Sequence, residues 1–292
     1  MASYKSFAVV GAGMIGLPII NALAERNASV VLLSRPGSST KAVPSAVEIV
    51  QVDYNDVTAV ATVFKQFKVE VVLSTVNFAG IAAQKSLIDA AKIAAVKLFA
   101  PSEYGAPTDT QPAGASNPIG GIAPKNQIAK NQIAEYLKSV NLPSMRIFTG
   151  LFIEVIPWLV GYSDHGKVRI VGKGEAPASF TSVTDIAGFV AYVLTTLPPT
   201  ELEDSIFRLE GERSSLNDLG GQFKTLVEHV DRIEGEAGEV KTGLLLLLGS
   251  GAGSTGWDEA KKAERSGTEA AGSANALWQG HRWKTIKEVL NL

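Results

Sequence analysis

Three glycines near the N-terminus have the spacing of a dinucleotide-binding turn. Gly11, Gly13 and Gly16 follow an apolar run, Phe7–Val10, and precede a helical pattern of apolar residues. In such a turn the first glycine permits the tight bend, the second lets the backbone approach a pyrophosphate, and the third lets the helix pack on the strand. The free N–H groups at the helix N-terminus then face the anion. An ordinary strand–helix turn is the alternative. The residues expected to contact the dinucleotide are Gly11, Gly13, Met14, Ile15 and Gly16.

The end of the next apolar run indicates which dinucleotide is bound. Residues 28–33 predict a second buried strand, followed by Ser34 and Arg35 with no acidic residue nearby. In this position an acidic residue would hold the ribose 2′-hydroxyl of NAD, whereas arginine suits the 2′-phosphate of NADP. Lys41 is a candidate for additional support. We therefore expect NADP(H) as cofactor, the alternative being that Arg35 is a solvated surface residue.

Two further strand ends contain polar residues that suit a ligand. Asp53 ends a strand predicted over 47–53, and it could contact the adenine amine or equally cap the helix that begins near Asp56. A strand over 69–73 is followed by Ser74, Thr75 and Val76. Ligands of open α/β sheets collect at the carboxyl ends of the strands. These positions are therefore expected to contact the cofactor: Asp53, Ser74, Thr75 and Val76.

Sequence patterns of several catalytic mechanisms are missing. None of the tyrosines has a lysine four residues later, as short-chain dehydrogenases do, and Tyr136 has Val140 there. Ser102 lacks the G-x-S-x-G frame of a hydrolase nucleophile. The histidines have neither H-E-x-x-H nor paired-carboxylate spacing, so no metal site is expected. The isolated histidines are His165, His229 and His281.

Lys130 is the remaining candidate for acid–base chemistry. It lies in a helix expected over 125–140, after a segment over 106–122 rich in Pro, Gly, Ser, Thr and Asn that is long enough to form a flap over the site. A lysine beside a desolvated nicotinamide pocket can lose pKa units and then donate or relay a proton near neutral pH. Taken alone, Lys130 and its neighbour Lys125 are more often surface residues.

Five strand–helix alternations position these residues. The helices are expected over 57–67 and 84–93, with a fifth strand over 97–100, and such alternation predicts a parallel sheet covered on both faces. The fold class is therefore α/β, a Rossmann-type doubly wound parallel sheet with a smaller, interleaved C-terminal region. We expect an NADP-binding domain over 1–150 and a substrate-binding region over 151–292.

The pattern weakens along the second half of the chain. We expect a sixth strand, an apolar segment containing Phe152 and Trp158, and a capped helix that begins near Ser182 and ends near Thr195. A weaker strand and helix follow, and then a segment of loop with short helix. The ranges are 142–148 for the strand, 150–162 for the apolar segment, 205–209 and 215–228 for the weaker strand and helix, 249–276 for the loop segment and 283–290 for a last helix.

Composition excludes several classes of function. The chain has 292 residues and a formal charge of −2, so no strong attraction to nucleic acid or membranes is expected. It has no cysteine, which excludes disulfides and thiolate catalysis and fits a reducing compartment. The leucine run 244–248 is too short to span a bilayer. We expect a soluble cytoplasmic protein, a monomer or homodimer, that acts on a small molecule.

The chain resembles the NmrA-like and isoflavone-reductase-like family of atypical short-chain dehydrogenases. The likeness covers about residues 5–200 and includes the helix start at Ser182–Ile186, whereas the C-terminal tail matches poorly. The plant members include isoflavone, pinoresinol–lariciresinol and phenylcoumaran benzylic ether reductases. The motifs that carry the likeness are the glycine turn, Leu33–Arg35, Ser74–Val76, Gln84 and, above all, Phe99-Ala-Pro-Ser-Glu-Tyr-Gly105.

The resemblance implies roles for individual residues. In the family the catalytic lysine precedes apolar residues at +3 and +7 and a proline at +13. Lys130 has Ile133, Leu137 and Pro143 at these offsets, whereas Lys125 does not match. Phe152 matches a pocket phenylalanine. The resemblance adds cofactor contacts at Gln84, Pro101, Ser102 and Lys130.

Two departures resemble the fungal NmrA-like branch of the family more than the plant reductases. The plant enzymes usually have G-x-x-G-x-x-G, which is one residue longer than the turn at Gly11–Gly16. Gly150 stands where they carry an asparagine near the nicotinamide. Both differences weigh against an aromatic-ether substrate.

The sequence leaves more than one function open. The first hypothesis is an NADPH-dependent reductase that transfers hydride to a small aromatic, enone or benzylic-ether-type substrate, with Lys130 as proton donor or relay. The second is a non-catalytic, NADP(H)-sensing NmrA-like regulator that acts through protein partners. A third, an isomerase or epimerase with tightly held NAD, is disfavoured by Arg35 and by the missing Tyr-x-x-x-Lys. The substrate pocket is expected to include Phe78, Gly150, Phe152 and Phe180.

Overall fold

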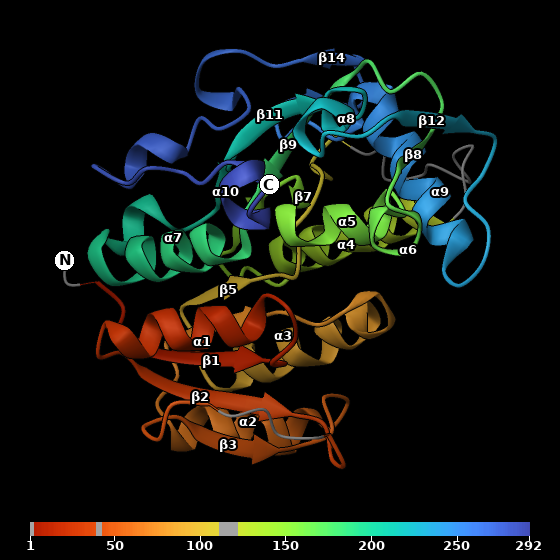
Figure 1. The fold of residues 1–292 in the computed structure, drawn as a ribbon. Helices are drawn as coiled ribbons and strands as arrows, with labels where there is room; N and C mark the ends of the chain where they lie inside the picture. The colour runs from red at the N-terminus through yellow and green to blue at the C-terminus, as the bar shows by residue number, and fades with distance from the viewer. Residues whose placement is uncertain (1–2, 39–42, 111–121) are drawn as a thin grey trace. The chain divides into compact units, whose positions relative to one another are not determined.

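The computed structural model describes residues 3–38, 43–110 and 122–292, and it divides into two compact units (Figure 1). Unit 1 comprises residues 1–102, 129–146 and 186–206, and unit 2 comprises residues 103–128, 147–185 and 207–292. The chain therefore passes several times between the units. The assignment of NADP binding to residues 1–150 and of substrate binding to residues 151–292 stays a prediction.

The core of unit 1 is a five-stranded parallel sheet with the order β3-β2-β1-β4-β5. Val10 in β1 is opposite Leu33 in β2 and Ser74 in β4, so the carboxyl ends of these strands are aligned. The predicted α/β class with a doubly wound parallel sheet is confirmed. The strands are β1 (Ser6–Val10), β2 (Ser29–Ser34), β3 (Glu48–Gln51), β4 (Val71–Ser74) and β5 (Leu98–Ala100).

Apolar residues on both faces of this sheet explain why helices cover it. One face packs against α2 (Val57–Gln66), α3 (Gln84–Ile93) and the second half of α4 (Ile122–Ser139). The buried residues of α1 (Gly16–Glu25) recur at helical spacing. This helix lies beside α7 (Val183–Thr196), because the guanidinium of Arg26, directly after α1, lies 5.4 Å from the centre of the Tyr192 ring.

A sixth strand follows β5 but is joined to it by a single bridge. The strand predicted over 142–148 is observed as β6 (Met145–Phe148), which pairs with β10 (Ser205–Arg208). Ser144 forms an isolated parallel bridge with Phe99 of β5. β6 therefore begins where it can continue the sheet beyond β5.

Unit 2 consists of short strands and helices around a separate apolar core. β9 (Pro177–Thr181) lies between β7 (Leu151–Phe152) and β11 (Glu212–Ser215), whereas β8 (Val168–Val171) pairs with β12 (Val227–Val230). The small helices of this unit include η2 (Ile153–Val155), α5 (Ile156–Leu159), α6 (Tyr162–His165), α8 (Asp218–Gln222) and α9 (Gly238–Leu247).

The helix expected over 215–228 is wrong. Only α8 is helical there, and the segment ends in β12, which pairs in parallel with β8. Two consecutive glycines, Gly220 and Gly221, disfavour a long helix. A Cβ on Gly220 would lie 2.5 Å from Val227 Cγ2, so the chain turns back tightly at this glycine.

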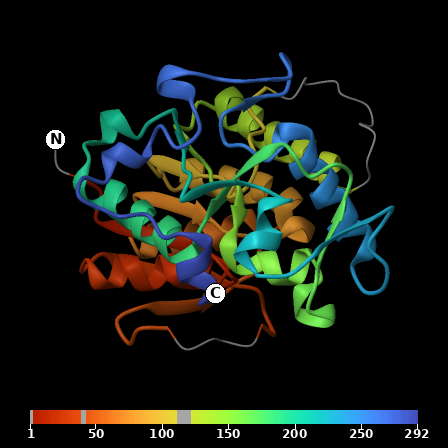
Figure 2. The same ribbon diagram turned by 45° about the horizontal axis from the view of Figure 1, so that its top comes forward.

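The C-terminal tail is more ordered than its composition suggests. The segment 249–276 contains a π-helical turn, η4 (Leu248–Ala252), a two-stranded hairpin of β13 (Trp257–Asp258) and β14 (Ala263–Glu264), and two 3₁₀ turns, η5 (Gly267–Glu269) and η6 (Asn275–Leu277). The last helix, α10 (Ile286–Leu290), begins with a capping box of Thr285 and Glu288. Ile286 of α10 belongs to the unit 2 core. The chain ends directly after this last helix, at the marked C-terminus (Figure 2). Across the described ranges, no helix combines the length and apolarity needed to cross a bilayer.

Candidate functional site

The glycine turn has the geometry that a phosphate needs. Gly11 has a φ of +93°, and its N–H donates to the Leu33 carbonyl at 2.9 Å. A Cβ on Gly16 would lie 2.3 Å from the Gly11 carbonyl oxygen, whereas a Cβ on Gly13 would meet nothing within 4 Å. The turn therefore needs glycine for its backbone at positions 11 and 16, and it is open to an approaching group at position 13.

Two residues of the turn differ in how their side chains lie. The side chain of Met14 is 56% exposed, whereas Ile15 is buried beneath the start of α1. An anion at the N-terminus of α1 would meet the backbone N–H groups of these residues. Their expected contact with the cofactor therefore needs no particular side chain.

Ser34 and Arg35 lie at the carboxyl end of β2. The hydroxyl oxygen of Ser34 is buried and lacks a hydrogen-bond partner among the described residues, and Arg35 is exposed. Burial raises the pKa of the neighbouring Tyr54 phenol to about 12, and the positive charge of Arg35 opposes this rise. A buried hydroxyl without a partner beside an exposed guanidinium fits a ribose carrying a phosphate. Lys41, the expected support, lies outside the described residues.

Asp53 and Asp56 have different roles after β3. Asp56 is the N-cap of α2, because its carboxylate accepts the Ala59 N–H at 2.9 Å. The suggestion that Asp53 caps this helix is therefore wrong. The Asp53 carboxylate is exposed and accepts the N–H of Asn55 at 3.0 Å, and its contact with adenine stays a prediction.

The end of β4 brings further polar groups to the same edge of the sheet. Ser74 is fully buried, and its hydroxyl oxygen has no partner within the part of the chain that the structure describes. Thr75 is 7% exposed and directs its hydroxyl to the glycine turn. Like Ser34, Ser74 therefore leaves an unpartnered hydroxyl at a carboxyl strand end, as expected for a site that binds a polar ligand.

Hydrogen bonds through Gln84 and Ser102 connect the ends of β4 and β5. The Ser102 N–H donates to Gln84 Oε1 at 2.8 Å, and the Ser102 hydroxyl donates to the Val76 carbonyl at 2.8 Å. Gln84 is fully buried, and its amide nitrogen donates to Ile81. Gln84 and Ser102 therefore bond to protein groups, and Pro101 is buried beside them. Direct cofactor contacts by these residues stay predictions.

Lys130 reaches the segment that follows β4. Its Nζ lies 5.8 Å from the centre of the Phe78 ring, at the start of η1 (Phe78–Ala83). Phe78 is 53% exposed, so one part of its surface is available to a ligand. Lys130 is half-buried, whereas Lys125 on the same helix is exposed. The two lysines therefore differ in exposure, and the catalytic role of Lys130 stays a prediction.

The three pocket residues expected in unit 2 differ in their surroundings. Gly150 has a φ of +64°, and a Cβ there would lie 2.0 Å from the Ser179 carbonyl oxygen. Phe152 is half-buried in β7. Phe180 has no exposed surface and belongs to the apolar core of the unit, so its ring is part of the core and not an accessible wall.

Tyr104 lies in the Phe99–Gly105 motif but was not among the expected site residues. Its backbone has a φ of +33°, which is strained for a tyrosine, and its hydroxyl is buried without a hydrogen-bond partner among the described residues. Burial raises the pKa of this phenol, so it stays protonated at neutral pH. Tyr104 has Thr108 and not lysine four residues later, so the Tyr-x-x-x-Lys pattern does not indicate this phenol.

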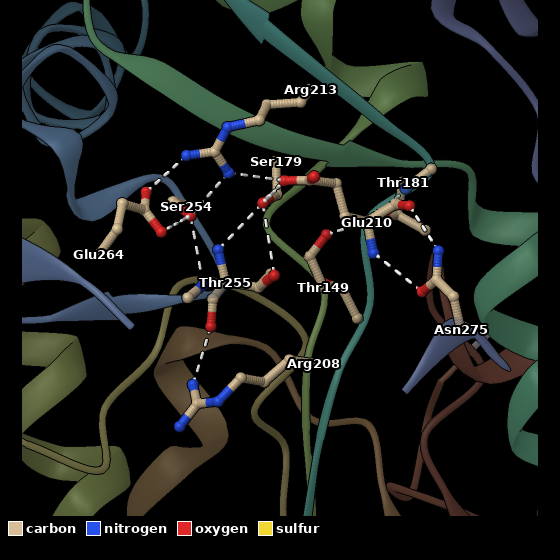
Figure 3. Close-up of polar contacts among 12 residues, drawn as sticks. Thr149, Ser179, Thr181, Arg208, Glu210, Arg213, Ser254, Thr255, Glu264 and Asn275 are labelled. Carbon is tan, nitrogen blue, oxygen red and sulfur yellow. Dashed lines mark hydrogen bonds and ion pairs between the residues drawn. The ribbon is translucent and has the colours of Figure 1, made fainter. Parts of the chain in front are cut away.

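A polar network inside unit 2 was also missed. The Ser179 hydroxyl donates to the Glu210 carboxylate at 2.5 Å, and Arg213 connects Glu210 to Glu264 (Figure 3). Arg208 pairs with Asp109 at 2.5 Å, with both side chains buried. The partners are far apart in the sequence, and no local pattern indicates such pairs. In the described ranges, His, Asp and Glu side chains form no group suited to a metal ion.

Comparison with known proteins finds relatives in sequence and a solved structure with a similar fold. The oxidoreductase aprR of Aspergillus flavus is 36% identical over 72% of this chain and 70% of its own. The phenylcoumaran benzylic ether reductase IRL1 of Ginkgo biloba is 31% identical over 52% of this chain and 49% of its own. The binary complex of leucoanthocyanidin reductase with NADPH from Vitis vinifera superposes with a TM-score of 0.75 at 18% identity, over 98% of both chains.

The family model is matched over most of the chain. The model of the NmrA-like family covers residues 3–230, which include the glycine turn, Arg35 and Lys130. The match extends beyond the likeness expected over about 5–200. The chain therefore belongs to the NmrA-like family.

Proposed function

We propose that this chain is an NADPH-dependent reductase of small aromatic, enone or benzylic-ether-type molecules, with Lys130 as the proton donor or relay. The single observation that carries the proposal is the position of Lys130 beside Phe78, in the same unit as the glycine turn. Names of similar proteins agree, since they include an oxidoreductase and a benzylic ether reductase.

The residues of unit 1 fit NADP(H). Gly11, Gly13 and Gly16 offer the pyrophosphate an open backbone cradle, and Arg35 offers the 2′-phosphate a guanidinium. The unpartnered hydroxyls of Ser34 and Ser74 offer hydrogen bonds to the sugars or to the amide of the nicotinamide. When bound, NADPH supplies a hydride, so the protein must supply the proton that completes the reduction.

In this proposal Lys130 holds that proton. Its Nζ donates the proton to the substrate oxygen on which negative charge develops, and the amine then takes a proton from solvent. The face of Phe78 attracts the ammonium through the ring quadrupole and so keeps it near the end of β4. The exposed part of the same ring suits a flat, apolar substrate.

A binding and turnover experiment tests this function. Calorimetry should show NADPH binding to the full chain, and absorbance at about 340 nm should then fall when a panel of quinones, enones and benzylic ethers is added. Oxidation of NADPH with any member supports the reductase. NADPH binding without oxidation by any member would instead support the sensor that acts through protein partners, which is the second candidate.

One observation favours the second candidate. The Ser179 carbonyl occupies the space that a side chain at Gly150 would need, so the asparagine of the plant reductases has no place here. With glycine at position 150, this chain lacks the amide side chain that the plant reductases carry near the nicotinamide. The turnover panel decides between the two functions.

Cofactor preference gives a first testable prediction. We expect Arg35→Ala to weaken NADPH binding by about 10- to 100-fold, because a hydrogen bond to a charged group contributes about 1.5–3 kcal/mol. NADH lacks the 2′-phosphate, so its affinity should stay the same. Calorimetric titration with both nucleotides measures the effect, with Arg232→Ala as a control because Arg232 is an exposed arginine of unit 2. Equal losses for both nucleotides would contradict the role of Arg35.

A further inference from the structure

Thr75 makes an unusual set of contacts at the end of β4. Its N–H donates to the Val10 carbonyl at 3.0 Å. Its hydroxyl lies 3.0 Å from the Val10 carbonyl oxygen and 2.9 Å from that of Gly11, so one hydroxyl proton serves both acceptors. Because Thr75 is 7% exposed, water offers these groups little competition. The hydroxyl therefore connects β4 directly to the first residue of the glycine turn.

The third glycine of the turn makes room for this hydroxyl. A Cβ on Gly16 would lie 2.4 Å from Thr75 Oγ1 and 2.3 Å from the Gly11 carbonyl oxygen. The Gly11 carbonyl, the Thr75 hydroxyl and the α-carbon of Gly16 thus form one close-packed group. Two neighbours therefore require glycine at position 16, and one of them is the side chain of the residue that follows β4.

This group controls how the turn presents its N–H groups. Gly11 has a φ of +93° and no side chain to restrict it, so its peptide plane can rotate unless a contact holds the carbonyl. If the carbonyl rotated, the N–H groups that follow it would point elsewhere. The hydroxyl of Thr75 holds the carbonyl inward, which leaves the turn open at Gly13.

We propose that Thr75 is a positioning residue, whose hydroxyl holds the 11–16 turn in the shape that binds the nucleotide. This inference rests on the proposed function for the identity of the nucleotide. It differs from the sequence-based expectation that Thr75 contacts the cofactor, because the hydroxyl proton is shared by two backbone carbonyls. The hydrogen bonds that hold the turn are within the protein, so the shape of the turn can be measured without nucleotide.

Three variants test this role. Thr75→Val keeps the shape of the side chain and removes the hydroxyl, Thr75→Ser keeps the hydroxyl, and Thr62→Val is a control at an exposed threonine of α2. The first measurement is hydrogen exchange of the amides of residues 11–17 in the nucleotide-free protein. The second is the Kd for NADPH by calorimetry.

The expected results separate positioning from other roles. Thr75→Val should speed exchange of these amides and weaken NADPH binding by at least about tenfold, because the Gly11 carbonyl loses its hydroxyl donor. Thr75→Ser should restore both to within about threefold of the wild-type values, because the hydroxyl is retained. Thr62→Val should match the wild type. Should Thr75→Val fail to fold, Thr75→Ala gives the same comparison.

Other results would overturn the proposal. Weaker NADPH binding with unchanged exchange would make Thr75 a direct ligand. Faster exchange with unchanged affinity would mean that the nucleotide does not depend on the shape of the turn. If the wild-type protein binds no NADPH, the proposed function fails, and the exchange data alone still decide whether the hydroxyl holds the turn.

Discussion

Lys130→Met is expected to lower kcat by about 10²- to 10⁴-fold on whichever panel compound the wild-type protein reduces, the usual contribution of a positioned general acid. Methionine keeps much of the length and apolar contact of the lysine side chain but has no proton to donate. The Nζ of Lys130 lies above the Phe78 ring at the carboxyl edge of the sheet, away from the glycine turn's own contacts. The Kd for NADPH should therefore change by less than about tenfold, since most of the nucleotide contacts lie elsewhere.

Matched variants make this result specific. Lys125→Met removes an exposed lysine from the same helix and should leave kcat unchanged. Lys130→Arg keeps the positive charge, but arginine does not lose its proton at neutral pH, so kcat should stay low. Recovery of turnover in Lys130→Arg would assign the lysine to charge stabilisation and not to proton transfer. Full turnover in Lys130→Met would remove Lys130 from the mechanism.

The parallel sheet of unit 1 could be predicted because its signals are local. The strands are short, largely apolar runs, all but the second are followed by a helical pattern, and Gly11–Gly16 separates the first strand from the first helix. Strand ends differ from the expectation by a few residues: the run predicted over 47–53 is observed as β3, Glu48–Gln51. Candidate residues at the carboxyl ends followed from the same pattern, because parallel strands align these ends.

Unit 2 could not be predicted in the same way because its contacts join distant segments. β8 and β12 are four residues each, too short for a clear period. The ion pair of Asp109 with Arg208 joins residues 99 positions apart. The contact of the Thr75 hydroxyl with Gly11 is also distant, at 64 positions. The sequence lists these residues, but it does not indicate which of them are partners, because the fold alone brings them together.

Gly150→Asn is expected to destabilise the protein by at least about 3 kcal/mol more than Gly166→Asn. Both glycines lie in unit 2 and have nearly the same backbone, with φ of +64° and +63°. Asparagine tolerates this left-handed conformation better than most residues, so the conformational cost should be small and similar at both sites. The difference is steric: a Cβ at Gly150 would lie 2.0 Å from the Ser179 carbonyl oxygen, whereas one at Gly166 would meet nothing within 4 Å.

Ser179 has little freedom to move away from a side chain at position 150. It belongs to β9, the middle strand of its sheet, and its hydroxyl is bonded to Glu210 and to the Thr255 N–H (Figure 3). Shifting its carbonyl would disturb the sheet and this buried network together. Urea unfolding of both variants measures the difference in their free energies of unfolding. Equal losses of stability would show that β9 can shift to make room for the side chain. In that case the asparagine of the plant reductases could be accommodated, and their side chain could be introduced here to test whether it changes the choice of substrate.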